Sequence, residues 1–193
     1  MSNKKLEIRL AGSGGQGLVL AGIILAEAAI LYDNKNAVNT QSYGPEARGG
    51  ASKSEVIISE EEIDYPKCEQ LDILLCLNQK SLDKYGDELK KGGLLIVDSD
   101  LCPEIPEGEF LFYKIPFTQL AREELKKSFV ANIIALGAVG GLTDCINRVA
   151  LERAVMERVP KGTEELNRKA LAVGYREAAA QRVEQPIDTE DLA

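Results

Sequence analysis

The feature that most constrains the fold is a glycine-rich loop between two apolar segments near the amino terminus. Residues 6–11 have the weak alternation of a β-strand, and residues 18–31 are nearly all apolar, as in a buried helix. The loop between them consists of Gly12, Ser13, Gly14, Gly15, Gln16 and Gly17. Its glycines have the G-x-G-x-x-G spacing, and the order strand, loop, helix is typical of the first unit of a parallel α/β sheet.

Such a loop can bind an anion, because it brings backbone N–H groups and the positive end of a helix dipole to one place. The alternative is that the glycines only allow the strand and the helix to pack closely. The loop alone does not decide between these two interpretations.

The rest of the chain follows the same architecture. Apolar runs predict further strands at residues 37–43, 52–59, 71–77, 94–97 and 110–115. The first of the later helices is expected after Ser81, and it should end at Lys90 and Lys91, before Gly92 and Gly93. Further helices are expected at 116–127, 129–142, 148–158 and 164–180. Asn147 and Thr163 should cap the last two. This order predicts an α/β domain over residues 1–180, with a mostly parallel sheet flanked by helices and a C-terminal helical extension. Residues 181–193 carry four acids and are expected to form a mobile tail.

A second glycine-bearing segment follows the expected strand at 37–43. It contains Ser42, Tyr43, Gly44, Pro45, Glu46, Ala47, Arg48, Gly49 and Gly50. If the first two strands are parallel, their carboxyl ends lie at one edge of the sheet and the two loops face each other. Arg48 would then offer a two-pronged donor to phosphate or carboxylate, beside accessible backbone N–H groups. The alternative is that Glu46 pairs with Arg48 and that the pair only shapes the loop.

The composition argues against several kinds of catalytic site. The chain has no histidine, which excludes Ser-His-Asp chemistry and histidine-bound metals within it. Its four cysteines, Cys68, Cys76, Cys102 and Cys145, include no Cys-x-x-Cys pair, so we expect reduced, mostly buried thiols and no iron–sulfur cluster or zinc site on this chain. We therefore assign no catalytic residue and no metal ligand.

The charge and the length of the apolar runs indicate the cellular setting. A net charge of −8 argues against nucleic acid as a partner. The apolar stretches at 18–32 and 129–142 are shorter than the roughly 20 residues that a bilayer requires. The first residues lack the apolar core of a signal peptide. We expect a soluble, cytoplasmic protein that contacts no membrane.

A nicotinamide-dependent oxidoreductase is an alternative that the glycine spacing raises. That fold also requires an acid at the end of the second strand, to bind the ribose hydroxyls. Here the position falls at residues 41–43, which are uncharged, and Asp33 comes before the strand. The acid that an independent NAD(P)-binding enzyme would need for the ribose is therefore missing from this position. A purely structural interaction module, in which the glycines serve packing alone, is the other alternative.

A few polar residues lie where their role is open. Asn78, Asp98 and Asp100 end strands, where turn formation is the usual role, although Asn78 could also donate to a ligand. Asn132 is the odd polar residue in an apolar helix, and it either ties that helix to a loop or reaches the cleft. Glycines at 137, 140 and 141 would let another helix approach closely, including one from a partner chain.

Together these segments resemble the gamma subunit, or fused gamma domain, of 2-oxoacid:ferredoxin oxidoreductases. The resemblance rests on the two early loops and on two later stretches, Asn132-Ile-Ile-Ala-Leu-Gly137 and Asn167-Arg-Lys-Ala-Leu-Ala-Val-Gly174. It extends from Leu6 to about Ala180, and it implies a Rossmann-like sheet.

The resemblance also implies a function. Members of the family oxidatively decarboxylate 2-oxoacids to acyl-CoA and pass electrons to ferredoxin. The resemblance implies that thiamine diphosphate lies between the alpha and beta subunits and that iron–sulfur clusters lie on other polypeptides. The gamma domain is implied to be an assembly element close to the active site that admits or binds coenzyme A. The expected partners are alpha and beta subunits, and a delta subunit where one is present. The candidate cofactor-binding residues are Gly12, Ser13, Gly14, Gly15, Gln16, Gly17, Tyr43, Gly44, Glu46, Arg48, Gly49, Gly50 and Asn132. Among the possible 2-oxoacids, the separate chain, its acidity and the missing cluster motif favour 2-oxoglutarate.

Overall fold

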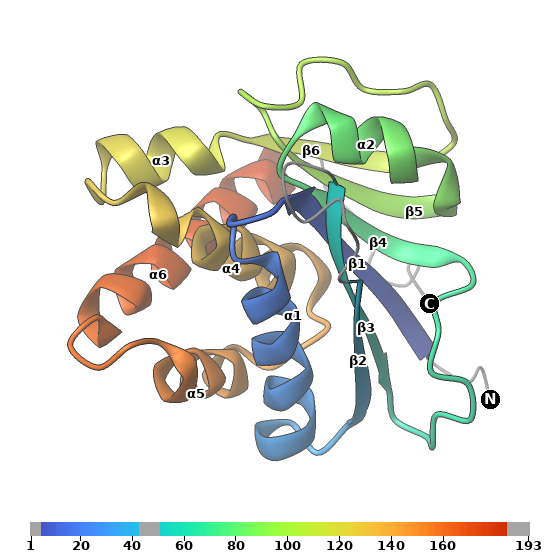
Figure 1. The fold of residues 1–193 in the computed structure, drawn as a ribbon, viewed down its shortest axis with the longest axis horizontal. Helices are drawn as coiled ribbons and strands as arrows, with labels where there is room; N and C mark the ends of the chain where they lie inside the picture. Colours follow the sequence, from blue (N-terminus) through green and yellow to red (C-terminus); the bar gives the residue numbers. More distant parts are fainter. Residues whose placement is uncertain (1–4, 43–50, 185–193) are drawn as a thin grey trace.

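The computed structural model describes residues 5–42 and 51–184 of the chain. They form a six-stranded sheet with the strand order β2-β3-β1-β4-β5-β6 (Figure 1). The strands are β1 (Lys5–Ser13), β2 (Asn36–Ser42), β3 (Ala51–Ser59), β4 (Leu71–Cys76), β5 (Leu89–Asp98) and β6 (Leu111–Ile115). The predicted α/β fold with a mostly parallel sheet flanked by helices is confirmed.

One strand departs from the parallel arrangement. β4, β5 and β6 follow β1 in parallel, whereas β3 runs antiparallel to both β1 and β2. β2 therefore points in the same direction as β1 although β3 lies between them. β2 and β3 thus form an antiparallel pair at one side of the sheet. Strand propensities alone do not show whether a strand pairs in a parallel or an antiparallel direction.

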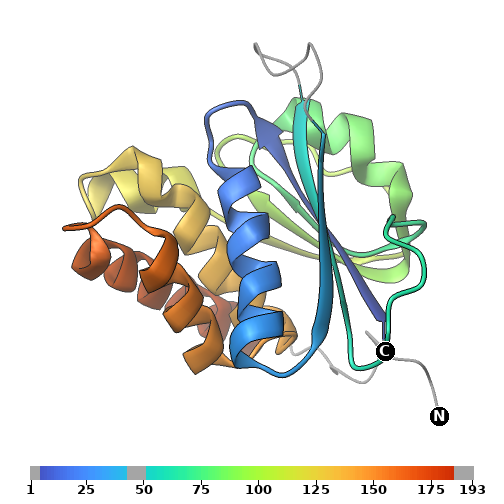
Figure 2. The same cartoon turned by 60° about the horizontal axis from the view of Figure 1, so that its bottom comes forward.

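The helices cover the two faces unequally. They are α1 (Leu18–Glu27), α2 (Gln79–Tyr85), α3 (Phe117–Glu123), α4 (Ala131–Thr143), α5 (Arg148–Arg158) and α6 (Glu164–Glu184), with a π-helical turn η1 (Ala28–Tyr32) and the 3₁₀ turns η3 (Gly86–Glu88) and η4 (Ser128–Val130). Figures 1 and 2 show α1, α4, α5 and α6 on one side of the sheet and α2 on the other.

Each face of the sheet has its own hydrophobic core. Successive side chains of β1 point to opposite faces of the sheet. Ile8 and Leu10 therefore lie in the larger core, with α1 and α4, and Ala11 lies in the smaller core under α2. β4 and β5 contribute apolar side chains to both cores, which explains why they read as continuous apolar runs.

A buried charge cluster lies on the α2 face of β1. Arg9 is only 2% exposed, and its guanidinium donates to Glu55 of β3 at 2.5 and 3.0 Å. The same guanidinium lies 2.6 Å from the carboxylate of Glu88 and 4.8 Å from the ring centre of Tyr85. Burial alone would raise the pKa of Glu55, but the hydrogen bonds from Arg9 and Lys53 hold it below its ordinary value. This cluster joins β1, β3 and the turn before β5.

The close contact between α4 and α6 explains the glycines of α4. A Cβ atom on Gly174 of α6 would meet the carbonyl oxygen of Ile134 and would lie 2.9 Å from Cα of Gly137. The predicted close approach of another helix is confirmed, and that helix is α6 of this chain. The two later stretches of the family resemblance meet at this contact.

Both boundaries of the helix after β4 differ from the prediction, and α3 ends at Glu123 instead of residue 127. The helix after β4 is capped by Asn78, whose Oδ1 accepts from the backbone N–H of Ser81 at 2.8 Å, and not by Ser81 itself. It ends at Tyr85, and residues 89–93 belong to β5, where Leu89 pairs with Leu71. Pairing with β4 outweighs the local signals of a helix end. Asn147 caps α5 as predicted, by accepting from Val149 at 2.8 Å.

The carboxyl-terminal helix is longer than expected. α6 continues to Glu184, beyond the predicted end at Ala180, and the remainder of the expected tail lies outside the described residues. Within residues 5–42 and 51–184, no helix combines the length and the apolar character needed to cross a bilayer.

Candidate functional site

The glycine loop lies where the connections of the sheet diverge. β1 leads into α1 on one face, whereas its parallel neighbour β4 leads into α2 on the other face (Figures 1 and 2). In open α/β sheets, ligands bind in the crevice beyond the carboxyl ends of two such strands. The loop after β1 and Asn78 after β4 lie at the position that such a crevice takes in sheets of this kind.

The loop leaves the first turn of α1 open. Gly17 is the N-cap of α1 with a φ of 75°, a left-handed conformation that favours glycine, and no side chain caps the helix. A Cβ atom on Gly17 would also meet the side-chain amide of Asn132. An uncapped amino terminus of a ten-residue helix offers N–H groups and partial positive charge to an anion.

Gln16 turns inward and holds the loop in shape. Its Oε1 accepts from the backbone N–H of Ser13 at 2.5 Å, and its Nε2 donates to the carbonyl of Leu77 at 3.1 Å. The backbone N–H of Gln16 also donates to the carbonyl of Ser13 at 3.2 Å. Both polar ends of Gln16 are thus engaged within the protein, and its role in this structure is to tie the loop to the end of β4.

Gly14 and Gly15 form the exposed part of the loop. Within the described part of the chain, their backbone N–H groups make no hydrogen bond. These two groups and the first turn of α1 are therefore the donors that the loop can offer to a ligand.

Two asparagines brace the loop from outside. Asn78 Nδ2 donates to Ser13 Oγ at 2.6 Å, so it connects the two sides of the crevice while its Oδ1 caps α2. Asn132 is 5% exposed, and its Nδ2 donates to the carbonyl of Gly17 at 3.1 Å. Its Oδ1 accepts from the N–H of Ile133 at 2.9 Å. Of the two alternatives for Asn132, the structure shows the tie between helix and loop.

The second glycine-bearing segment begins and ends at the same end of the sheet. Ser13 at the end of β1 pairs with Ala51 at the start of β3, and Ser42 at the end of β2 pairs with Lys53. The two anchors of this segment therefore lie near the glycine loop. Tyr43, Gly44, Glu46, Arg48, Gly49 and Gly50 lie outside the described residues, and their contribution to the site remains a prediction.

The other strand-end polar residues shape turns. Asp98 is fully buried and accepts hydrogen bonds from Thr118, through the backbone N–H at 2.9 Å and the hydroxyl at 2.6 Å. It also accepts from the N–H of Asp100 at 3.1 Å. The predicted turn role is confirmed for Asp98, which anchors the start of α3.

The cysteine thiols are poor nucleophiles. Cys76, Cys102 and Cys145 are buried and Cys68 is half-buried, as predicted, and none of them is in a disulfide. Burial raises the pKa of Cys68 and of Cys102 to about 12, and it raises the pKa of Cys76 well above its ordinary value. These thiols are protonated at neutral pH.

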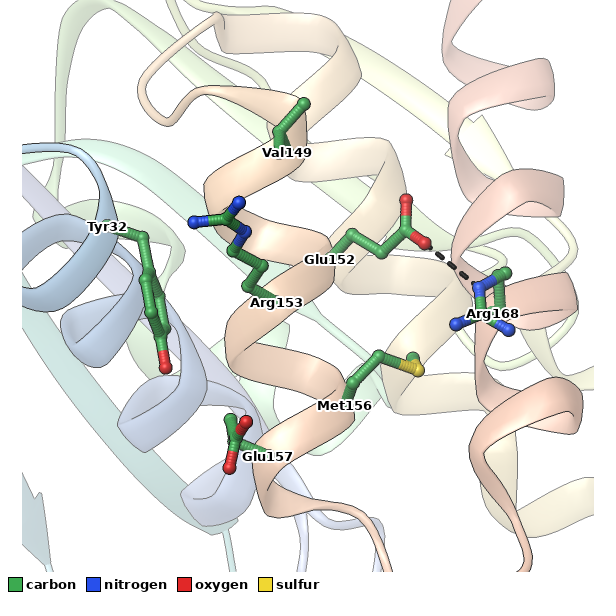
Figure 3. Close-up of a pocket in the computed structure, with 7 residues that line it drawn as sticks. All are labelled: Tyr32, Val149, Glu152, Arg153, Met156, Glu157 and Arg168. Carbon is green, nitrogen blue, oxygen red and sulfur yellow. Dashed lines mark hydrogen bonds and ion pairs between the residues drawn. The ribbon is translucent and has the colours of Figure 1, made fainter.

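A pocket that the sequence did not reveal lies at the opposite end of α1. Its volume is about 520 Å³, and Figure 3 shows Tyr32 of η1 facing Arg153 and Glu157 of α5, with Met156 below. Arg168 of α6 closes one side through an ion pair with Glu152 at 2.9 Å. The sequence contains one signal of this pocket, which is that its lining residues on α5 recur at helical spacing and so share one face. Such spacing is also typical of an exposed helix face, so it does not predict a pocket. The pocket is open and of mixed charge, and it is separate from the glycine loop.

Comparisons with known proteins agree with the architecture. A family model described as pyruvate ferredoxin/flavodoxin oxidoreductase matches residues 7–177. The 2-oxoglutarate synthase subunit KorC of Methanocaldococcus jannaschii is 57% identical over 171 residues, which cover 88% of this chain and 91% of that protein. The corresponding subunit of Methanothermobacter thermautotrophicus is 47% identical over 180 residues, which cover 90% of this chain and 95% of the relative.

Solved structures show the same fold. The keto/oxoacid ferredoxin oxidoreductase gamma subunit from Geobacter sulfurreducens is 51% identical, with a TM-score of 0.83, over 91% of this chain and 99% of that chain. The 2-oxoglutarate:ferredoxin oxidoreductase from Magnetococcus marinus has a TM-score of 0.83 at 24% identity, and it matches 93% of this chain with 32% of its own. By sequence and by fold, the chain belongs to the pyruvate ferredoxin/flavodoxin oxidoreductase family, as the gamma subunit of a 2-oxoacid:ferredoxin oxidoreductase.

Proposed function

We propose that this chain has no turnover of its own and that it supplies part of the coenzyme A site of its complex. The observation that carries the proposal is the glycine loop at the divergence of β1 and β4, where the N–H groups of Gly14 and Gly15 make no hydrogen bond within residues 5–42 and 51–184, beside a helix whose N-cap is a glycine. Coenzyme A is a polyanion, so backbone N–H groups and an arginine suit it. Its ribose carries a phosphate, so it does not require the acid that a nicotinamide site would place at the end of β2.

The absence of turnover rests on the side chains at the loop. Among the described residues, those that border it are Ser13, Gln16, Asn78 and Asn132, all of which are bonded within the protein. None of them is a general acid or base at neutral pH. Thiamine diphosphate would supply the decarboxylation chemistry from the alpha and beta subunits. Iron–sulfur clusters on other polypeptides would carry electrons to ferredoxin, which this chain meets only indirectly.

The named relatives support both the ligand and the substrate. The Magnetococcus marinus enzyme is described with 2-oxoglutarate, coenzyme A and succinyl-CoA bound. Four relatives, 38% to 57% identical, are named 2-oxoglutarate synthase subunit KorC. We propose 2-oxoglutarate as the 2-oxoacid of the complex, with alpha and beta subunits, and delta where one is present, as partners. The complex would act in the cytoplasm.

The test is the substitution Arg48→Ala in the reassembled complex. Loss of a charge-assisted hydrogen bond costs about 1.5–3 kcal/mol, so the KM for coenzyme A should rise roughly 10- to 100-fold while the KM for the 2-oxoacid stays constant. Equilibrium binding of coenzyme A to the complex should weaken by a similar factor. An unchanged KM and an unchanged affinity would remove Arg48 from the site.

Arg168→Ala is the matched control. It removes the same charge from the chain, but at the pocket beyond the other end of α1, where Arg168 is paired with Glu152 on the surface. We expect it to leave the KM for coenzyme A unchanged. If complexes with Arg48→Ala assemble fully and bind coenzyme A normally, Arg48 has no part in the site. If Asn132→Ala, which loosens the glycine loop, also leaves coenzyme A binding unchanged, the chain is a structural module and the coenzyme A site lies elsewhere.

A further inference from the structure

The hydroxyl group of Ser13 keeps a proton that it can still donate. Ser13 is half-buried at the end of β1, and its other polar groups have partners. Its N–H donates to Gln16 Oε1 at 2.5 Å, and its carbonyl accepts from the N–H of Gln16 at 3.2 Å. Its Oγ accepts from Asn78 Nδ2 at 2.6 Å. Within residues 5–42 and 51–184, no group accepts the hydroxyl proton itself.

The direction of the hydrogen bond between Asn78 and Ser13 is fixed by a third residue. Asn78 is the N-cap of α2, and its Oδ1 accepts from the backbone N–H of Ser81 at 2.8 Å. Because a backbone N–H can only donate, the amide oxygen of Asn78 must face Ser81 and the NH2 group must face Ser13. This NH2 group also can only donate, so Ser13 Oγ is the acceptor and its own proton is not used in this bond.

The hydroxyl of Ser13 lies next to the backbone donors of the glycine loop. Ser13 directly precedes Gly14 and Gly15, whose N–H groups make no hydrogen bond in the described part of the chain. Since side chains alternate along a strand, Ser13 shares the α2 face of the sheet with Ala11, which agrees with its contact with Asn78. The first turn of α1 lies on the other face. A ligand at the loop would therefore meet donors from both faces of the sheet.

We propose that Ser13 donates its hydroxyl proton in a hydrogen bond to a phosphate oxygen of coenzyme A, and that Asn78 positions the hydroxyl for this bond. The inference rests on the proposed function, and it adds a side-chain donor to the backbone donors of the loop. An ionised phosphate oxygen can only accept a hydrogen bond, so it suits a hydroxyl that still has its proton to donate. Asn78 acts through Ser13 and makes no contact with the ligand.

Equilibrium binding of coenzyme A and of pantetheine to the reassembled complex tests the role of Ser13. Ser13→Ala should weaken the binding of coenzyme A roughly 10- to 100-fold, the usual effect of losing a hydrogen bond to a charged group. It should leave the binding of pantetheine unchanged, because pantetheine has no phosphate group. Ser13→Thr keeps the hydroxyl and should restore most of the affinity for coenzyme A. An equal loss for both ligands would contradict a bond to phosphate.

Ser59→Ala is the matched control for the loss of a hydroxyl. Ser59 Oγ also accepts a hydrogen bond, from the backbone N–H of Glu61 at 3.0 Å. Ser59 pairs with Lys5, at the end of β1 opposite to Ser13. We expect this variant to bind coenzyme A with native affinity. A loss as large as that of Ser13→Ala would show that binding responds to a distant hydroxyl as well, which contradicts a direct contact.

Asn78→Asp tests the positioning. A carboxylate caps a helix as well as a carboxamide does, so the free energy of unfolding in urea should stay unchanged. The carboxylate would accept the proton of Ser13, which reverses the bond and leaves no hydroxyl donor for the phosphate. Coenzyme A should bind more weakly than it does to the Ser13→Ala complex, because the new charge also repels the phosphate. The double variant should bind no more weakly than Asn78→Asp alone, since both changes remove the same donor.

Three results would overturn the inference, and they point to different errors. If Arg48→Ala and Asn132→Ala weaken the binding of coenzyme A but Ser13→Ala does not, the coenzyme A site stands and the hydroxyl has no part in it. If the losses from Ser13→Ala and Asn78→Asp multiply in the double variant, Asn78 does not act through that hydroxyl. If Ser13→Ala, Arg48→Ala and Asn132→Ala all leave the affinity unchanged, the proposed function itself fails.

Discussion

At the scale of single residues, hydrogen bonds from three side-chain amides hold the glycine loop of the candidate site in place. Gln16 ties the loop to β4, Asn78 ties Ser13 to α2, and Asn132 ties Gly17 to α4. Each bond joins segments that are 61 to 115 residues apart in the sequence. The loop is thus braced before a ligand arrives, which lowers the entropy lost on binding.

Replacement of Asn132 tests this bracing. Asn132→Ala removes the bond to the carbonyl of Gly17 and should lower the free energy of unfolding by about 1–2 kcal/mol. If the loop binds coenzyme A, the same change should raise the KM for coenzyme A several-fold, with little effect on kcat. Chemical denaturation and steady-state kinetics of the complex measure the two effects.

Asn147→Ala is the control for Asn132→Ala. Loss of this helix cap should cost about 1 kcal/mol of stability, since Asn147 accepts from Val149 at the start of α5. Asn147 does not contact the glycine loop, so its replacement should not change the KM for coenzyme A. Equal kinetic effects of both variants would show that the loop responds only to overall stability.

At this scale, part of the site can be predicted from the sequence. It singled out Gly17 and Asn132, because a glycine spacing and a polar residue in an apolar helix are visible without a structure. It could not show that Gln16 points inward, since the acceptor of Gln16 Nε2 is the carbonyl of Leu77 at the end of another strand. The bonding of Asn132 to Gly17, rather than to the crevice, likewise depends on how α4 crosses α1.

At the scale of elements, the contact between α4 and α6 is set by backbone atoms. Gly137 faces the carbonyl of Leu171, and Gly174 faces the carbonyl of Ile134. Glycines at such a contact let two helices approach more closely than side chains would allow. Since α4 also carries Asn132, this packing positions the residue that holds Gly17.

We expect Gly174→Ala to separate the two helices. The added Cβ atom would lie 2.8 Å from the backbone nitrogen of Ala138, and backbone atoms cannot move aside without shifting a helix. The expected loss is about 1–3 kcal/mol of unfolding free energy, measured by urea denaturation. Ala172→Ser, on the exposed side of the same helix, should change it by less than about 0.5 kcal/mol. A neutral Gly174→Ala would mean that the contact is looser than described.

Element types were easier to predict than element partners. Residue patterns located all six strands, and the signal is most continuous in β4 and in the second half of β5, which are buried on both faces. The glycines of α4 predicted a close helix, but only the structure shows that α6 of the same chain fills that place. Lys90 to Gly93 look like a helix end, yet pairing of Leu89 with Leu71 draws them into β5, a choice that depends on contacts distant in sequence.

At the scale of the whole molecule, the charge cluster around Arg9 makes the stability of the fold depend on pH. The pKa of Glu55 is held below its ordinary value of 4.5 in the folded state by Arg9 and Lys53, against the effect of burial. A carboxyl with a lowered folded pKa stabilises the fold fully above its ordinary pKa. That contribution is lost as the pH falls from about 4.5 through the lower folded value.

Glu55→Gln should therefore make the free energy of unfolding depend less on pH between about pH 3 and pH 5. At pH 7 we expect a loss of about 1.5–3 kcal/mol, because the buried guanidinium of Arg9 loses a charged partner. The difference from the native chain should shrink below pH 4. Thermal unfolding at several pH values measures this, with Glu109→Gln as a control, since its pair with Lys91 is exposed and contributes little. A constant difference between pH 3 and pH 7 would contradict the assignment.

Within residues 5–42 and 51–184, the four side chains that support the glycine loop share one further property: none of them titrates in the physiological range. Hydroxyl and carboxamide groups keep the same hydrogen-bonding pattern from mildly acidic to mildly alkaline conditions. The shape of this corner of the molecule should therefore stay constant when the proton concentration of the cell drifts. Any acidity dependence of the assembled enzyme would then have to originate in groups elsewhere.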